Sequence, residues 1–165
     1  EDANSARNAL ENSGKAERFL FLKPVGKERL IDYYRSCDIV LDQFGQGLFA
    51  ATMLEAMSIG VPVIASLDMD FYAAAYNDEV PPICNVSSPS DLQRHLADLC
   101  ADREARLARG RILREWVMRH HGETTFGPVL LALLQMAADN VRLETELSHP
   151  FRQRSADAGQ VKGAL

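Results

Sequence analysis

The segment Gly45-Gln46-Gly47-Leu48-Phe49-Ala50-Ala51-Thr52 is the part of the sequence whose residue types could do chemistry. It is a turn of small residues that follows a short apolar run and leads into a helical pattern. Free backbone N–H groups at a helix N-terminus, together with the helix dipole, form an anion site. Small side chains let a phosphate approach this backbone. The segment is neither GxGxxG nor a Walker loop, so the pattern predicts phosphate binding without naming the ligand.

Glu55 is the only acid in the helix that the pattern predicts from Phe49 to Ile59. From the second turn, its carboxylate could reach a ligand docked at the helix N-terminus. A carboxylate beside a phosphate site is well suited to accept hydrogen bonds from ribose hydroxyls. The alternative is an ordinary buried helix with one acid at its edge. The residues alone leave both interpretations open.

Short apolar runs alternate with helical patterns, which is typical of successive βα units. The runs predict strands over residues 19–22, 38–41, 61–65 and 83–86. The helical patterns cover residues 1–12, 28–36, 49–59, 91–101, 103–120 and 126–147, and Ser90 is the expected N-cap of the helix over 91–101. We therefore expect an α/β fold with a Rossmann-like, doubly wound parallel sheet that closes with C-terminal helices.

Ligands of such sheets bind outside the carboxyl ends of the strands. Three connections, residues 23–27, 43–49 and 66–82, are expected there. The connection over 66–82 is long for a compact domain, so it is a candidate binding loop. Asp42 and Gln43 sit at the carboxyl end of a predicted strand, where functional residues gather.

Composition limits the remaining classes of function. The chain has 165 residues, 47% of them hydrophobic, and a formal net charge of −5, which indicates a globular domain and disfavours nucleic acid as its main partner. Cys37, Cys84 and Cys100 lack the spacing of a disulfide framework or a zinc site. The apolar run near residues 129–138 is about half of the roughly 20 residues that a membrane span needs. We expect a cytoplasmic location, no metal and no cofactor.

Four stretches resemble, in order, the C-terminal domain of group 1 retaining GT-B glycosyltransferases. They are FLFLKPV, LxxYYRSCDIVLDQF, GLFAATMLEAMSIGVPVIAS and PPICNVSSPSDLQRHLADLCADREARLARGRILREWVMRHH. The resemblance covers roughly residues 1–134. It implies the C-terminal half of a GT-B fold that binds a nucleotide-diphosphate sugar and takes part in retaining sugar transfer.

The resemblance also implies roles for single residues. The family has two glutamates eight positions apart, the first near the donor sugar and the second on the ribose. Glu55 matches the second, whereas Gly47 stands where the first would be, with Gln46 as a polar neighbour. The implied donor-binding residues are Lys23, Val25, Gln46, Gly47, Leu48, Phe49, Ala50, Ala51, Thr52 and Glu55. Among them, Lys23 to Val25 match a loop that reads the nucleobase, and no catalytic residue is assigned.

The resemblance also implies a first strand, a helix with a diphosphate-binding lysine and a second strand ahead of these motifs, and we expect them to lie upstream of residue 1. We therefore expect a nucleotide-sugar-binding domain over residues 1–147, a flexible tail over 148–165, and a separate domain for a glycan, lipid-linked or protein acceptor. The isolated chain should be inactive and could self-associate. The alternatives are a nucleotide-binding or scaffold module without catalysis, and a nucleotide-sugar epimerase.

Three further groups of residues have a simpler and a more specialised interpretation. His120 and His121 could bind a metal or cap their helix, and capping is the simpler interpretation. Asp68 and Asp70 lack the spacing of a calcium loop. Six arginines, at positions 103, 106, 109, 111, 114 and 119, could face an anionic membrane, which would place the chain at the inner face of a membrane, or form a solvated helix face.

Overall fold

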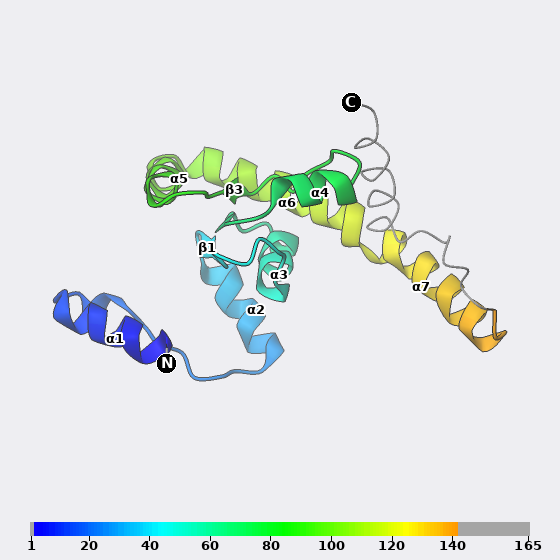
Figure 1. Ribbon diagram of the computed structural model, residues 1–165. Helices are drawn as coiled ribbons and strands as arrows, with labels where there is room; N and C mark the ends of the chain where they lie inside the picture. Colours follow the sequence, from blue (N-terminus) through cyan, green and yellow to red (C-terminus); the bar gives the residue numbers. More distant parts are fainter. Residues whose placement is uncertain (1, 142–165) are drawn as a thin grey trace, which may run out of the picture. The chain divides into compact units, whose positions relative to one another are not determined.

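The structure is a computed structural model that describes residues 2–141 (Figure 1). Two compact units divide the chain between Leu30 and Ile31. The first unit holds α1 (Asp2–Asn12) and the short 3-10 helix η1 (Ala16–Arg18). Helix α2 (Lys27–Ser36) runs across the boundary. The expected tail over 148–165 lies outside the described residues.

The second unit contains a parallel sheet of three strands in the order β1-β2-β3. The strands are β1 (Val40–Leu41), β2 (Val63–Ala65) and β3 (Cys84–Asn85). Val40 pairs with Val63, and Ile64 pairs with Cys84. Because every strand is followed by a helix before the next one begins, the α/β architecture that the sequence predicts is confirmed.

Five helices accompany the sheet in the described part of the second unit. They are α3 (Ala51–Ile59), α4 (Met69–Ala75), α5 (Pro89–Ala101), α6 (Arg103–His121) and α7 (Glu123–Ala138). Leu92, Leu96 and Leu99 of α5 pack on the sheet face that carries Ile64 and Cys84. The last helix begins earlier than predicted and ends at Ala138, and residues 142–147 of the predicted helix lie outside the described residues.

Helix α3 is covered on more than one side, as its apolar composition predicts. Met53, Ala56 and Met57 are fully buried. At its C-terminus Gly60 adopts φ +87°, and a Cβ placed on Gly110 of α6 would lie 1.9 Å from the Gly60 carbonyl oxygen. Two glycines therefore allow α6 to cross the end of α3 at backbone contact.

The prediction of a strand over residues 19–22 is wrong. These residues form no strand, and Phe19 and Leu20 are 52% and 78% exposed. A strand needs a neighbour to pair its backbone N–H and C=O groups. In doubly wound sheets each strand pairs with a neighbouring strand. Residues 2–18, the described residues ahead of this stretch, form helices and turns and so provide no such neighbour.

The connection over 66–82, which the sequence predicts as a long candidate binding loop, is not without secondary structure, because Met69–Ala75 within it form α4. Asp68 caps the helix, since its carboxylate accepts a hydrogen bond from the Phe71 N–H at 3.0 Å. The N-cap of α5 differs from the predicted one. It is Ser88 rather than Ser90, and Pro89 opens the first turn. Local capping chemistry therefore sets both helix starts.

Helix α7 is apolar and exposed around its circumference. Phe126, Val129, Leu131 and Leu134 are each more than half exposed, and no residue of the helix is buried. Within residues 2–141, no helix has both the length and the apolar character that crossing a membrane requires.

Candidate functional site

The turn before α3 begins where β1 ends and is fixed to the segment that follows β2. Gly47 adopts φ +69° and forms a parallel bridge with Leu67. The backbone N–H of Asp68 donates to the Gly47 carbonyl at 3.0 Å. The turn therefore lies at the carboxyl-end edge of the sheet, where doubly wound folds bind their ligands.

The N-terminus of α3 has no side-chain cap. Ala50 is the N-cap residue, with φ −101° and ψ 160°, and its methyl group cannot accept a hydrogen bond. Helix geometry leaves the first N–H groups, those of Ala51, Thr52 and Met53, without a carbonyl partner inside the helix. Ala51 is exposed, Thr52 is half-buried and Met53 is fully buried, so a ligand can reach the amides of Ala51 and Thr52. These amides and the positive end of the helix dipole are suited to bind an anion.

The backbone N–H of Phe49, one of the donor-binding residues that the resemblance implies, already has a partner within the chain. Its N–H donates to the hydroxyl of Tyr72 at 2.6 Å, and the two rings lie 4.3 Å apart. Tyr72 belongs to α4 and is 4% exposed. The amides available at this end of α3 are therefore those that follow Ala50.

Glu55 is the fifth residue of α3 and lies in its second turn, as the sequence predicts. Its side chain is half-buried, and its backbone carbonyl accepts a hydrogen bond from the Ser58 hydroxyl at 2.7 Å. In the same unit, Gln46 and Leu48 are exposed on the turn. Eight of the ten predicted donor-binding residues lie within residues 46–55, in the turn and the first half of α3, and their part in donor binding stays a prediction.

Lys23 and Val25 belong to the first unit. Lys23 is exposed and Val25 is half-buried. Their part in reading a nucleobase stays a prediction.

Gly47 has a backbone conformation that explains why no glutamate stands there. A φ between +50° and +70° costs L-residues about 1–2 kcal/mol, and glycine avoids this cost. A Cβ at this position would lie 3.4 Å from the Cβ of Asp68, which is an ordinary contact. The backbone conformation, and not a lack of space, therefore favours glycine at the position where the resemblance implies a glutamate.

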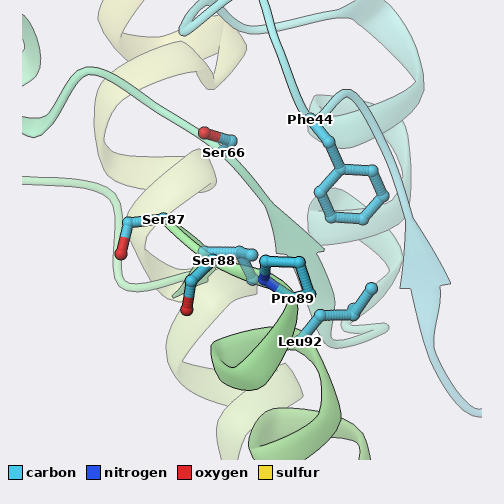
Figure 2. A pocket seen from close by; sticks show the side chains of 7 residues that line it. Phe44, Ser66, Ser87, Ser88, Pro89 and Leu92 are labelled. Carbon is cyan, nitrogen blue, oxygen red and sulfur yellow. The ribbon is translucent and has the colours of Figure 1, made fainter.

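A cavity of about 260 Å³, which the sequence did not reveal, lies beyond the carboxyl ends of the strands (Figure 2). It is lined by Phe44, Ser66, Val86, Ser87, Ser88, Pro89 and Leu92. The hydroxyls of Ser87 and Ser88 donate to the Asp91 carboxylate at 2.7 and 2.9 Å. These bonds, together with Arg94, hold the pKa of Asp91 far below its usual range. Two of the three serine hydroxyls that line the cavity donate to Asp91, so the surface left for a ligand is mainly apolar.

Asp42 and Gln43 continue the β1 backbone beyond Leu41. The Asp42 N–H donates to the Ile64 carbonyl at 3.1 Å, and the Ser66 N–H donates to the Gln43 carbonyl at 2.9 Å. Asp42 Oδ2 and Gln43 Oε1 are buried without a hydrogen-bond partner among the described residues. Burial raises the pKa of the Asp42 carboxyl. Both residues follow the carboxyl end of β1, and a functional role for them stays a prediction.

His120 and His121 make contacts other than the expected helix capping. The Nε2 atom of His120 lies 2.9 Å from the Glu79 carboxylate, which also pairs with Arg119 at 3.1 Å. The Nε2 atom of His121 lies 3.0 Å from the Tyr76 hydroxyl. Desolvation by the surrounding rings and the nearby His120 lower the pKa of His121. Within the described range, no group of three or more candidate ligands is placed to hold a metal ion.

Four of the six arginines of α6 bind groups of the chain itself. Their partners are Asp38 and the Leu99 carbonyl for Arg106, the Pro82 carbonyl for Arg109, the Ser58 carbonyl for Arg114, and Glu79 for Arg119. These contacts connect α6 to the loops around the sheet.

Comparisons with known proteins agree with this architecture. The family described as glycosyl transferases group 1 matches residues 1–116. A D-inositol 3-phosphate glycosyltransferase of Mycolicibacterium vanbaalenii is 27% identical over 105 residues, which are 64% of this chain and 23% of that protein. One of the same name from Corynebacterium urealyticum is 26% identical over 115 residues, 70% of this chain and 27% of that protein.

The matched stretch thus spans about a quarter of the length of these curated relatives. The search of solved structures gave no significant match. Because the family match covers well over half of the residues, this chain belongs to the group 1 glycosyl transferases.

Proposed function

We propose that this chain forms the donor-binding part of a retaining glycosyltransferase, which transfers a sugar from a nucleotide-diphosphate sugar to an acceptor. The observation that carries the proposal is the start of α3. It follows the turn at the carboxyl end of β1, and its N-cap residue Ala50 leaves the first amides without a side-chain partner. Family membership supplies the reason to assign sugar-donor chemistry to this edge.

The proposed ligand would place its diphosphate at the amides of Ala51 and Thr52. Sugar transfer leaves a nucleoside diphosphate whose negative charge grows as the bond to the sugar breaks. Fixed N–H donors and a helix N-terminus stabilise such charge without having to reorient. Glu55, one turn further along the helix, would accept hydrogen bonds from the ribose hydroxyls.

The acceptor would bind outside the described units. The curated relatives are about four times as long as the stretch they share with this chain. We propose that a further domain of the full-length protein supplies the acceptor site, for a glycan, a lipid-linked or a protein acceptor.

A second candidate function is nucleotide binding without sugar transfer. The observation in its favour is Gly47, which provides no carboxylate near the donor sugar and whose φ of +69° disfavours one. In this case the full-length protein would bind a nucleotide sugar and leave it intact.

Calorimetric titration of the full-length protein with UDP, GDP and their sugar conjugates tests the proposal. Dissociation constants below about 100 μM for one nucleoside diphosphate are expected, and release of that diphosphate in the presence of an acceptor separates the two candidates. A protein that binds none of these ligands contradicts both.

A further inference from the structure

We infer that Tyr72 is a positioning residue for the diphosphate site, an inference that rests on the proposed function. Tyr72 lies in α4, the helix that takes the place of the predicted loop. Its hydroxyl accepts the Phe49 N–H at 2.6 Å, and its ring lies 4.3 Å from the Phe49 ring. Phe49 immediately precedes the N-cap residue of α3. Tyr72 therefore holds the peptide unit between Leu48 and Phe49, two units before the first amide that would bind phosphate.

A second bond from the start of α4 fixes the same turn. The Asp68 N–H donates to the Gly47 carbonyl at 3.0 Å, while the Asp68 carboxylate accepts the Phe71 N–H at 3.0 Å and caps α4. The preceding residue, Leu67, exchanges hydrogen bonds of 2.8 and 3.2 Å with the side chain of Asn85 at the end of β3. The turn is thus connected, through α4, to the sheet.

These bonds determine where the helix amides point. Donors stabilise a developing charge only when they already occupy the correct positions before the reaction. Tyr72 is 4% exposed, so water cannot readily replace its hydroxyl as the partner of Phe49. Without that hydroxyl, the turn must move to give the Phe49 N–H another partner, and the amides of Ala51 and Thr52 move with it.

Tyr76 provides a matched control because it is a second tyrosine from the same segment. It is the C-cap residue of α4, and its hydroxyl lies 3.0 Å from His121 Nε2. Its ring lies 5.0 Å from Trp116, within the same aromatic group. Replacing either tyrosine by phenylalanine removes one hydroxyl and one hydrogen bond, but only Tyr72 bonds the turn.

The experiment compares the wild-type full-length protein with Tyr72→Phe and Tyr76→Phe. Each is titrated with UDP and GDP, and with uridine and guanosine, which lack phosphate. We expect Tyr72→Phe to weaken the binding of the preferred diphosphate at least fivefold while its nucleoside affinity stays within twofold. Tyr76→Phe should change both affinities by less than twofold. A merely structural role would weaken nucleoside and diphosphate binding alike.

Three results would overturn the inference in distinguishable ways. Unchanged diphosphate binding by Tyr72→Phe removes Tyr72 from the account and leaves the proposed function intact. Equal losses in the two variants assign the effect to packing. A wild-type protein that binds neither diphosphate removes the proposed function and the inference together.

Hydrogen exchange on the wild-type protein gives a second measurement that needs no variant. The Phe49 amide should exchange at least a hundredfold more slowly than an exposed amide, because its hydrogen bond to Tyr72 is buried. Rapid exchange at Phe49 would contradict the inference even if Tyr72→Phe failed to fold.

Discussion

The starts of α3 and α5 occupy equivalent places and differ in chemistry. Each helix follows the carboxyl end of a strand, β1 for α3 and β3 for α5. At α5, the Ser88 hydroxyl accepts the Asp91 N–H at 3.2 Å, and the Asp91 carboxylate accepts the Ser87 N–H at 3.2 Å. At α3, the N-cap residue is Ala50, and its side chain makes no such bond.

The difference indicates that the start of α5 contributes to stability, whereas the start of α3 is available to a ligand. The side chains at α5 satisfy the helix terminus and place a carboxylate there, so that an anion would be repelled. The start of α3 leaves its amides to an external partner and carries no acid in its first turn. A helix terminus that its own side chains do not satisfy costs stability, typically about 1 kcal/mol, which a bound ligand can offset.

Adding a side-chain cap at the start of α3 should have the largest effect on activity. Ala50→Asp places an N-cap carboxylate where the diphosphate is proposed to bind. We expect turnover of the full-length protein to fall roughly a hundredfold, the scale for losing preorganised donors, while stability rises by about 1 kcal/mol. Steady-state kinetics checks the loss of turnover, and thermal unfolding of the same sample checks the gain in stability. Retained turnover would contradict the phosphate assignment.

Loss of the Glu55 charge should have the next largest effect. Hydrogen bonds to charged groups contribute about 1.5–3 kcal/mol, so Glu55→Gln should weaken nucleotide binding at least tenfold with the fold intact. Glu115→Gln, at an exposed position on α6, is the matched control and should leave binding unchanged. An unaltered dissociation constant for Glu55→Gln would remove this residue from the site.

Restoring the family's glutamate should lower stability. Gly47→Glu forces an L-residue into a left-handed conformation beside Asp68, and we expect the free energy of unfolding to fall by about 1–2 kcal/mol. Chemical denaturation measures this change. A variant as stable as the wild type would show that the turn tolerates the glutamate, and the conformational explanation for Gly47 would be lost.

Removing the cap of α5 should have the smallest effect and act on stability alone. Ser88→Ala is expected to cost about 1 kcal/mol of unfolding free energy and to leave nucleotide affinity unchanged. Parallel denaturation and titration check this. Weaker nucleotide binding in Ser88→Ala would mean that the two helix starts are not functionally distinct.

The elements that sequence patterns predict well are those with complete local signals. Helix α3 combines small residues, an apolar interior and a terminal glycine, and it lies within two residues of its predicted start. The β2 strand is a continuous buried apolar run. Other parts of the second unit cover each of these elements on more than one side, so the apolar composition of each is enough to identify it.

The errors have physical causes that a linear pattern does not contain. The apolar residues Phe19 and Leu20 have strand composition, but strand formation depends on a neighbouring strand. Helix α4 was missed because its seven residues are short for a helical period and because Asp68, its N-cap, was considered only as a calcium ligand. The bond between Phe49 and Tyr72 joins residues 23 positions apart, which only tertiary packing reveals.

Amide chemical shifts during titration with the preferred nucleoside diphosphate test the central claim most directly. In the ¹⁵N-labelled full-length protein, the amides of Ala51 and Thr52 should shift at ligand concentrations that leave the capped Asp91 and Leu92 amides unchanged. Shifts confined to the start of α5, or saturable binding without any change at Ala51 and Thr52, would contradict the assignment of the diphosphate site to α3.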